Sequence, residues 1–134
     1  MYLLDTNIVS DAKRGFAPVV KWMRSVESKT LYISVLTIGE LTHGVHKLSR
    51  KDPHAAIALR TWLVGFRLNQ EDRILDVNEV ICEEWGRISA IRSRDDADAL
   101  IAATATVYGF ILVTRNARDF DDTGVALFNP WEQR

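Results

Sequence analysis

The chain has 134 residues, which suits one domain over residues 1–134, because a second domain would be too small to hold its own core. Its 47% hydrophobic and 26% charged residues are typical of a globular protein. Its net charge of −1 excludes a general positive field that would draw the whole chain onto nucleic acid or an anionic membrane. Any contact with nucleic acid must therefore use a local basic patch or a metal ion, or come through a partner.

The sequence also bears on the compartment. Cys82 is the single cysteine and cannot form an internal disulfide, which favours a reducing compartment; with no CxxC partner, it is expected as a small core residue. The N-terminus lacks a basic segment followed by an apolar one, and no apolar run approaches the roughly 20 residues that span a bilayer. We therefore expect a soluble, cytoplasmic protein with no membrane contact.

Apolar periodicity predicts two strands and four helices in the first half of the chain. In chain order, these are a buried strand at 2–4, a short helix at 7–13 stopped at Gly15, a helix at 17–28 with Pro18 in its first turn, a strand at 31–36, a helix from Thr37, and a helix at 54–67 after a loop at 49–52.

The second half predicts a strand at 73–77, a helix from Val80 to Ile91, a helix at 96–108, a strand at 110–114 and an edge strand at 125–130. Helix 96–108 is small and apolar on nearly every face, which indicates burial on both sides. Strand 110–114 is continuously apolar, which is typical of a parallel strand covered on both faces. Strands alternating with helices predict βαβ units, a short central parallel sheet and a three-layer α/β/α sandwich.

Four carboxylates are candidates for one site. Asp5 follows the first strand, Asp119 follows the strand at 110–114, and Glu40 is expected in the first turn of the helix after the second strand. In such folds ligands bind at the carboxyl edge of the sheet, where these three positions meet. Asp98 joins them only if helix 96–108 begins near the same edge, and the sequence does not prove this.

Acidic residues near helix N-termini are common because they complement the helix dipole by about 0.3–1 kcal/mol, so each acid also has this simpler explanation. Glu40 and Asp98, however, lie in apolar stretches rather than on charged ones. Two like charges at 4 Å repel by about 4 kcal/mol at an effective dielectric of 20, so a buried cluster needs a cation. Carboxylate ligands without Cys or paired His favour Mg²⁺ or Mn²⁺, which suggests metal-assisted phosphodiester hydrolysis.

Polar companions surround these acids in the sequence. Some could bond the carboxylates or water molecules on the metal: Thr6, Asn7, Thr114 and Asn116. Asn7 has the alternative role of a helix N-cap. Arg115 and Arg118 could hold RNA phosphates, or be solvated surface charge.

Other signals favour structural roles. His43 and His46 could bind a metal, but surface or partly packed histidines are the commoner case. Trp62 and Phe66 are four residues apart on one predicted helix, so both lie on the same face. We expect that face to be a dimer or partner surface.

The motifs together resemble a known family. DTN at 5–7, LTIGEL at 36–41, DALIAATA at 98–105 and VTRNARDF at 113–120 resemble the PIN-domain ribonucleases, and more narrowly the VapC toxins of toxin–antitoxin modules. The tail GVALFNPW at 124–131 is similar to the FitB-like subgroup. The resemblance covers essentially the whole chain, with the motifs in family order and spacing.

This resemblance implies a toxin of a type II toxin–antitoxin module that acts as a Mg²⁺- or Mn²⁺-dependent endoribonuclease. It makes Asp5 and Asp98 the principal metal ligands and Glu40 the acid of the third helix. Asp119 is the fourth acid, although relatives place it at the position of either Asn116 or Asp119, and Asp121 and Asp122 crowd the same loop. The family also implies a homodimer and a DNA-binding, VapB-like antitoxin that inserts a segment into the acidic cleft.

Two other functions stay open. A FitB-like regulatory subunit would act mainly through its complex with a DNA-binding partner, although four retained acids favour a working site. A flap-type DNA nuclease shares the fold, but its helical insertions do not fit in so short a chain.

Overall fold

A five-stranded parallel sheet forms the centre of the computed structural model, which describes residues 1–132. The strand order is β3-β2-β1-β4-β5, and each neighbouring pair is parallel. The strands are short: β1 Tyr2–Leu4, β2 Leu31–Ser34, β3 Ile74–Leu75, β4 Ile111–Val113 and β5 Leu127–Phe128. In this order β1 and β4 lie side by side, so the segments that follow them meet at the carboxyl edge.

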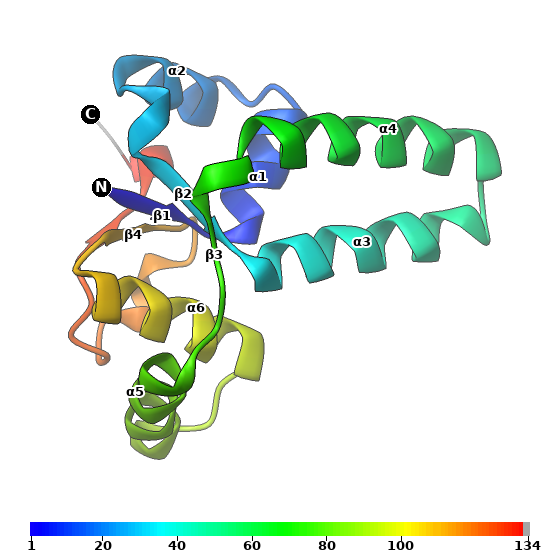
Figure 1. The fold of residues 1–134 in the computed structure, drawn as a ribbon. Helices are drawn as coiled ribbons and strands as arrows, with labels where there is room; N and C mark the ends of the chain where they lie inside the picture. The colour runs from blue at the N-terminus through cyan, green and yellow to red at the C-terminus, as the bar shows by residue number, and fades with distance from the viewer. Residues whose placement is uncertain (133–134) are drawn as a thin grey trace.

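Helices cover both faces of the sheet (Figure 1). Leu3 of β1 and Leu112 of β4 pack into a core with α5 and α6, whereas the next residues along, Leu4 and Val113, pack into a second core with α1 and α2. This alternation follows from the strand period of two. It confirms the predicted α/β/α sandwich. The helices are α1 Thr6–Lys13, α2 Ala17–Ser25, α3 Val35–Ser49, α4 Pro53–Asn69, α5 Glu79–Ile91 and α6 Asp96–Tyr108.

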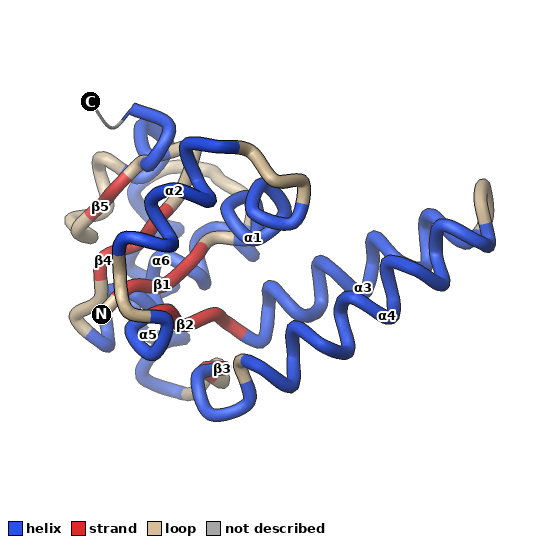
Figure 2. The backbone as a smooth tube through the Cα atoms, turned by 90° about the horizontal axis from the view of Figure 1, so that it is seen from above, coloured by secondary structure: helices blue, strands red, loops and turns tan. Residues whose placement is uncertain are grey.

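Helices α3 and α4 form an antiparallel hairpin, here called the α3–α4 arm, which projects away from the sheet (Figures 1 and 2). Trp62 and Phe66 do lie on one face of α4, with their rings stacked at 5.2 Å. That face is half-buried against the second core, and its use as a dimer or partner surface stays a prediction. The exposed apolar side chains of α4 are Ile57, Val64 and Leu68.

Several predicted boundaries differ from the structure. Strand 31–36 ends at Ser34, because the Ser34 hydroxyl accepts a hydrogen bond from the Leu36 N–H and caps α3. Helix α3 therefore begins at Val35 rather than Thr37, which places Glu40 in its second turn. Cys82 is exposed rather than in the core. Within residues 1–132, none of the helices has the length and apolar character needed to cross a bilayer.

Candidate active site

Asp5 is a buried carboxylate at the junction of β1 and α1. Its side chain is the N-cap of α1, with Oδ1 accepting the Thr6 N–H at 2.7 Å. Oδ2 accepts the Thr114 hydroxyl at 2.8 Å from the end of β4. Only 5% of Asp5 is exposed. Asp5 thus caps a helix and also holds a cross-strand contact that capping does not require.

On balance, the surroundings of Asp5 disfavour the ionised form of its side chain. Burial raises the pKa of Asp5, the hydrogen bonds from Thr114 and Thr6 lower it, and the nearby charges of Glu40 and Arg115 act in opposite directions. The net direction is a pKa above the ordinary aspartate value. A cation beside this carboxylate would reverse that direction.

Glu40 is tied to Asp5 through Thr6. The Thr6 hydroxyl donates to Glu40 Oε1 at 2.6 Å, while the Thr6 N–H binds Asp5. The hydroxyls of Thr6 and Thr37 are 3.0 Å apart. Because the single Thr6 proton goes to Glu40, Thr37 supplies the proton of this second bond. Glu40 is itself exposed, so it is not embedded among apolar residues as its neighbours in the sequence suggest.

Asp98 lies in the first turn of α6 and is half-buried. Helix α6 leads into β4, so its N-terminus lies at the carboxyl edge of the sheet. A site that includes Asp98 requires this position. Burial raises the pKa of Asp98 to about 6, and like charges add to the effect, namely those of Asp5, Asp95, Glu40 and Asp119. The other three predicted acids are therefore close enough to Asp98 for their charges to act on it.

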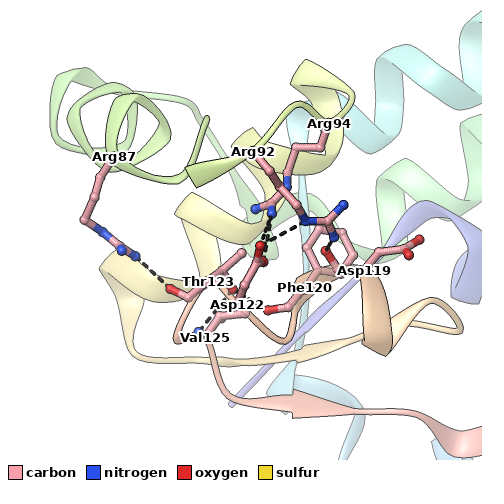
Figure 3. Close-up of polar contacts among 8 residues, drawn as sticks. All are labelled: Arg87, Arg92, Arg94, Asp119, Phe120, Asp122, Thr123 and Val125. Carbon is pink, nitrogen blue, oxygen red and sulfur yellow. Dashed lines mark hydrogen bonds and ion pairs between the residues drawn. The ribbon is translucent and has the colours of Figure 1, made fainter. Parts of the chain in front are cut away.

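The loop after β4 separates Asp119 from its acidic neighbours. Asp122 binds two arginines, with Arg92 Nε at 2.9 Å and Arg94 Nη2 at 2.7 Å (Figure 3). Desolvation acts to raise the pKa of Asp122, but these two arginines hold it below the ordinary value. The Asp119 carboxylate points away from both guanidinium groups (Figure 3). Asp122 is thus engaged in ion pairs, and Asp119 is left facing the cluster.

The predicted companions form a small network behind Asp5. The Thr114 hydroxyl accepts the Asn116 N–H at 3.1 Å while it donates to Asp5. Asn7 Nδ2 lies 3.4 Å from Asp5 Oδ2, and Asn7 Oδ1 accepts the Arg115 N–H. Asn7 is therefore not the N-cap of α1, and Asn116 contributes its backbone to this network.

The donor set suits a hard divalent cation. The converging groups are carboxylate and hydroxyl oxygens, and their mutual repulsion is the situation that a cation relieves. Among residues 1–132, no three acidic, histidine or cysteine side chains form a ready-made metal cage. An ion here would keep several water ligands, as Mg²⁺ commonly does. His43 and His46 are exposed on α3 and belong to no such group.

Sequence reasoning missed one buried acid. Asp11 of α1 is 1% exposed and accepts Arg115 Nη1 and Trp131 Nε1, each at 2.9 Å. This pairing holds Arg115, which the sequence offered either as an RNA phosphate contact or as solvated surface charge, and its side chain is still 46% exposed. A signal was present, since Asp11 lies three residues after the core residue Ile8, on the same helix face. A carboxylate on a core-facing position predicts a buried partner.

Comparison with known proteins agrees with this fold. A family model described as PIN domain matches residues 2–126. The chain belongs to the PIN domain family. The VapC ribonuclease Y4jK of Sinorhizobium fredii is 28% identical, over 98% of this chain and 99% of that protein.

Two solved structures are similar throughout. FitAcB from Neisseria gonorrhoeae has 30% identity and a TM-score of 0.90, covering 99% of this chain and 100% of that one. FitAB bound to the IR36 DNA fragment has 30% identity and a TM-score of 0.88, covering 100% and 98%. The family resemblance of the motifs is thereby confirmed over the whole described fold.

Proposed function

We propose that this protein is the toxin component of a type II toxin–antitoxin module and a Mg²⁺- or Mn²⁺-dependent endoribonuclease. The observation that carries the proposal is the convergence of Asp5, Glu40 and Asp119 on Asp98, whose pKa is raised to about 6 by burial and by these like charges. Its PIN domain and its similarity to a protein named as a VapC ribonuclease support RNA as the substrate. A cytoplasmic location, where RNA is available, belongs to the same proposal.

In this function the carboxylates divide the work. Asp5 and Asp98 would hold the ion, and Glu40 and Asp119 would complete the acidic site around it. When bound, the ion lowers the pKa of a water molecule and polarises the scissile phosphate. Thr114 and Thr6 fix both oxygens of Asp5. Glu40 and Asp119 are exposed, so an attacking water can reach either one and lose its proton there as the new P–O bond forms. The P–O bond to the leaving nucleoside breaks in the same displacement, and the leaving oxygen takes up a proton from solvent.

The test is cleavage of a mixed small-RNA substrate by the purified protein, free of any partner, with Mg²⁺, with Mn²⁺ and with EDTA. Asp5→Asn and Asp98→Asn should each abolish the metal-dependent cleavage. Asp96→Asn is the matched control, because Asp96 is exposed in the same turn of α6 as Asp98. Cleavage that survives both substitutions would contradict the assigned site.

The partner forms a second part of the proposal. We expect a homodimer and a DNA-binding, VapB-like antitoxin, since FitAB is similar over the whole chain and its structure contains DNA. The same similarity favours the alternative of a regulatory subunit with little nuclease activity. Coexpression with the neighbouring gene product and a promoter-binding assay separate the two. The alternative is supported if Asp98→Asn leaves DNA binding intact and the wild-type protein, freed of its partner, cleaves no RNA.

A further inference from the structure

Helix α3 carries a row of basic side chains that the proposed site does not use. His43, His46, Lys47 and Arg50 are all exposed, and together they line one surface hollow. We call these four residues the α3 basic track. Of these, positions 43, 47 and 50 follow one another at helical spacing, so they lie along one side of the arm.

The track begins at the acids. A neighbouring hollow is also lined by His43 and Glu40. Its other lining residues are Val35, Leu36, Gly39 and Ala97, the residue before Asp98. Glu40 is followed by His43, Lys47 and then Arg50 on the same helix. Glu40 and Arg50 are ten positions apart, which spans about 15 Å of helix. One continuous surface therefore joins the carboxylates to the outer part of the arm.

Two members of the track carry a full positive charge and have no acidic partner among the described residues. Lys47 and Arg50 form no ion pair within residues 1–132. Three arginines near the acids are instead paired, with Arg92 and Arg94 bound to Asp122 and Arg115 bound to Asp11. The track is thus a source of unneutralised positive charge next to a negative cluster.

The lining of the track favours a phosphate backbone over a protein segment. Among the described residues, the four that line its hollow all have basic side chains. A different hollow on the other side of Glu40 includes Leu41, Leu59 and Trp62 among its lining residues, with Lys13 Nζ 5.6 Å from the Trp62 ring. A mixed apolar and basic surface of that kind suits a protein partner. A purely basic one suits phosphates.

We propose that the α3 basic track binds the phosphate backbone of the RNA strand that extends from the cleavage site along the arm. The inference rests on the proposed function. A cluster of carboxylates repels an RNA strand, and the net charge of −1 supplies no general attraction. Cations farther along α3, about 10 to 15 Å of helix from Glu40, hold the strand on one side of the scissile bond and leave the site open to the ion.

The experiment measures binding of fluorescent single-stranded RNA of mixed sequence in EDTA, over a series of salt concentrations. Each phosphate contact contributes about 0.7 to the slope of log K against log salt for a single strand. The double variant Lys47→Gln, Arg50→Gln should lower the magnitude of that slope by about 1.4. The matched control is Arg60→Gln, Arg67→Gln, which removes the same charge from exposed positions of α4 and should leave the slope unchanged.

Cleavage with Mg²⁺ separates this inference from the proposed function. The track variant should raise KM for RNA with little change in kcat, because Lys47 and Arg50 lie away from the acids. If the wild-type protein cleaves RNA but the track variant has the KM and salt slope of the control, the RNA-binding role of the track is overturned and the proposed function stands. A track variant that binds RNA normally but loses its protein partner also overturns that role, and assigns the surface to that partner. Wild-type protein that neither binds nor cleaves RNA contradicts the proposed function itself.

Discussion

Replacing Asp98 by Asn should stabilise the protein in the absence of metal. The substitution keeps the size of the side chain and removes one of the charges that repel one another in the cluster. Burial and the charges of neighbouring acids raise the pKa of Asp98 from 3.8 to about 6. A carboxylate whose folded-state pKa is raised destabilises the folded protein once it ionises. The predicted metal ligand is thus a stability cost to the metal-free chain.

The size of the effect follows from the pKa. A pKa rise from 3.8 to about 6 would lower the free energy of unfolding by about 3 kcal/mol if the carboxylate were fully buried. Asp98 is half-buried, and screening by solvent reduces this to about 1–2 kcal/mol. In the unfolded chain the proton leaves near pH 4, and in the folded protein it leaves near pH 6. The penalty is therefore absent below about pH 4, grows as the pH rises to about 6, and is complete above that.

Urea or thermal unfolding in EDTA at pH 8 and pH 4 measures this directly. Asp98→Asn should raise Tm by about 2–8 °C at pH 8 and leave it nearly unchanged at pH 4. Asp96→Asn is the control, because it removes a charge from the same helix turn without relieving the cluster. Equal effects of the two substitutions at pH 8, or a gain for Asp98→Asn that persists at pH 4, would refute the reasoning.

Three further substitutions probe the supports of the site. Asp11→Asn should destabilise the protein by about 2 kcal/mol in urea unfolding; breaking a buried pair costs about 3–5 kcal/mol, but the Arg115 side chain is 46% exposed. Thr114→Val leaves Asp5 Oδ2 without its hydroxyl donor, so it should cost about 1–3 kcal/mol and weaken Mn²⁺ binding in calorimetry, whereas Thr114→Ser should restore both. Gly109→Ala should cost about 1 kcal/mol in thermal unfolding, because this C-cap has a φ of 69°.

Each of these has an outcome that contradicts it. Asp121→Asn removes an exposed charge and serves as the control for Asp11→Asn, so equal unfolding curves would show that the buried pair contributes nothing. If Thr114→Val binds Mn²⁺ with unchanged affinity, the Thr114 hydroxyl does not help Asp5 to bind the ion. A Gly109→Ala protein as stable as wild type would mean that the turn relaxes out of the left-handed region at no cost.

The sequence predicted the fold through burial patterns. The apolar run that ends before Thr114 and the small apolar helix at 96–108 have no polar face, so both had to be covered on both sides. The structure buries β4 and α6 in this way. Element ends were less predictable because side-chain caps decide them. Val35 and Leu36 extend an apolar strand pattern, yet Ser34 turns the chain into α3 there. Because α3 begins two residues earlier than predicted, Glu40 lies in its second turn instead of its first.

The site was predictable as far as chain position determines it. Asp5 and Asp119 follow neighbouring strands, and a parallel sheet brings such positions together. The competition between Asp119 and Asp122 was not predictable, because it is settled by Arg92 and Arg94, which come from the connection between α5 and α6. The pairing of Asp11 depends on contacts of the same long-range kind.

Helix capping alone does not account for this arrangement of acids. A cap at Asp5 requires the Thr6 N–H, but it does not require the Thr114 hydroxyl from another strand or burial to 5% exposure. An acid that only complements the dipole of α6 gains by staying in solvent, whereas Asp98 is half-buried beside other carboxylates and its pKa rises to about 6. Thr6 then fixes a third acid, Glu40, at the same edge. Each of these features either destabilises the metal-free protein or plays no part in capping a helix. All of them follow if the acids bind a cation together.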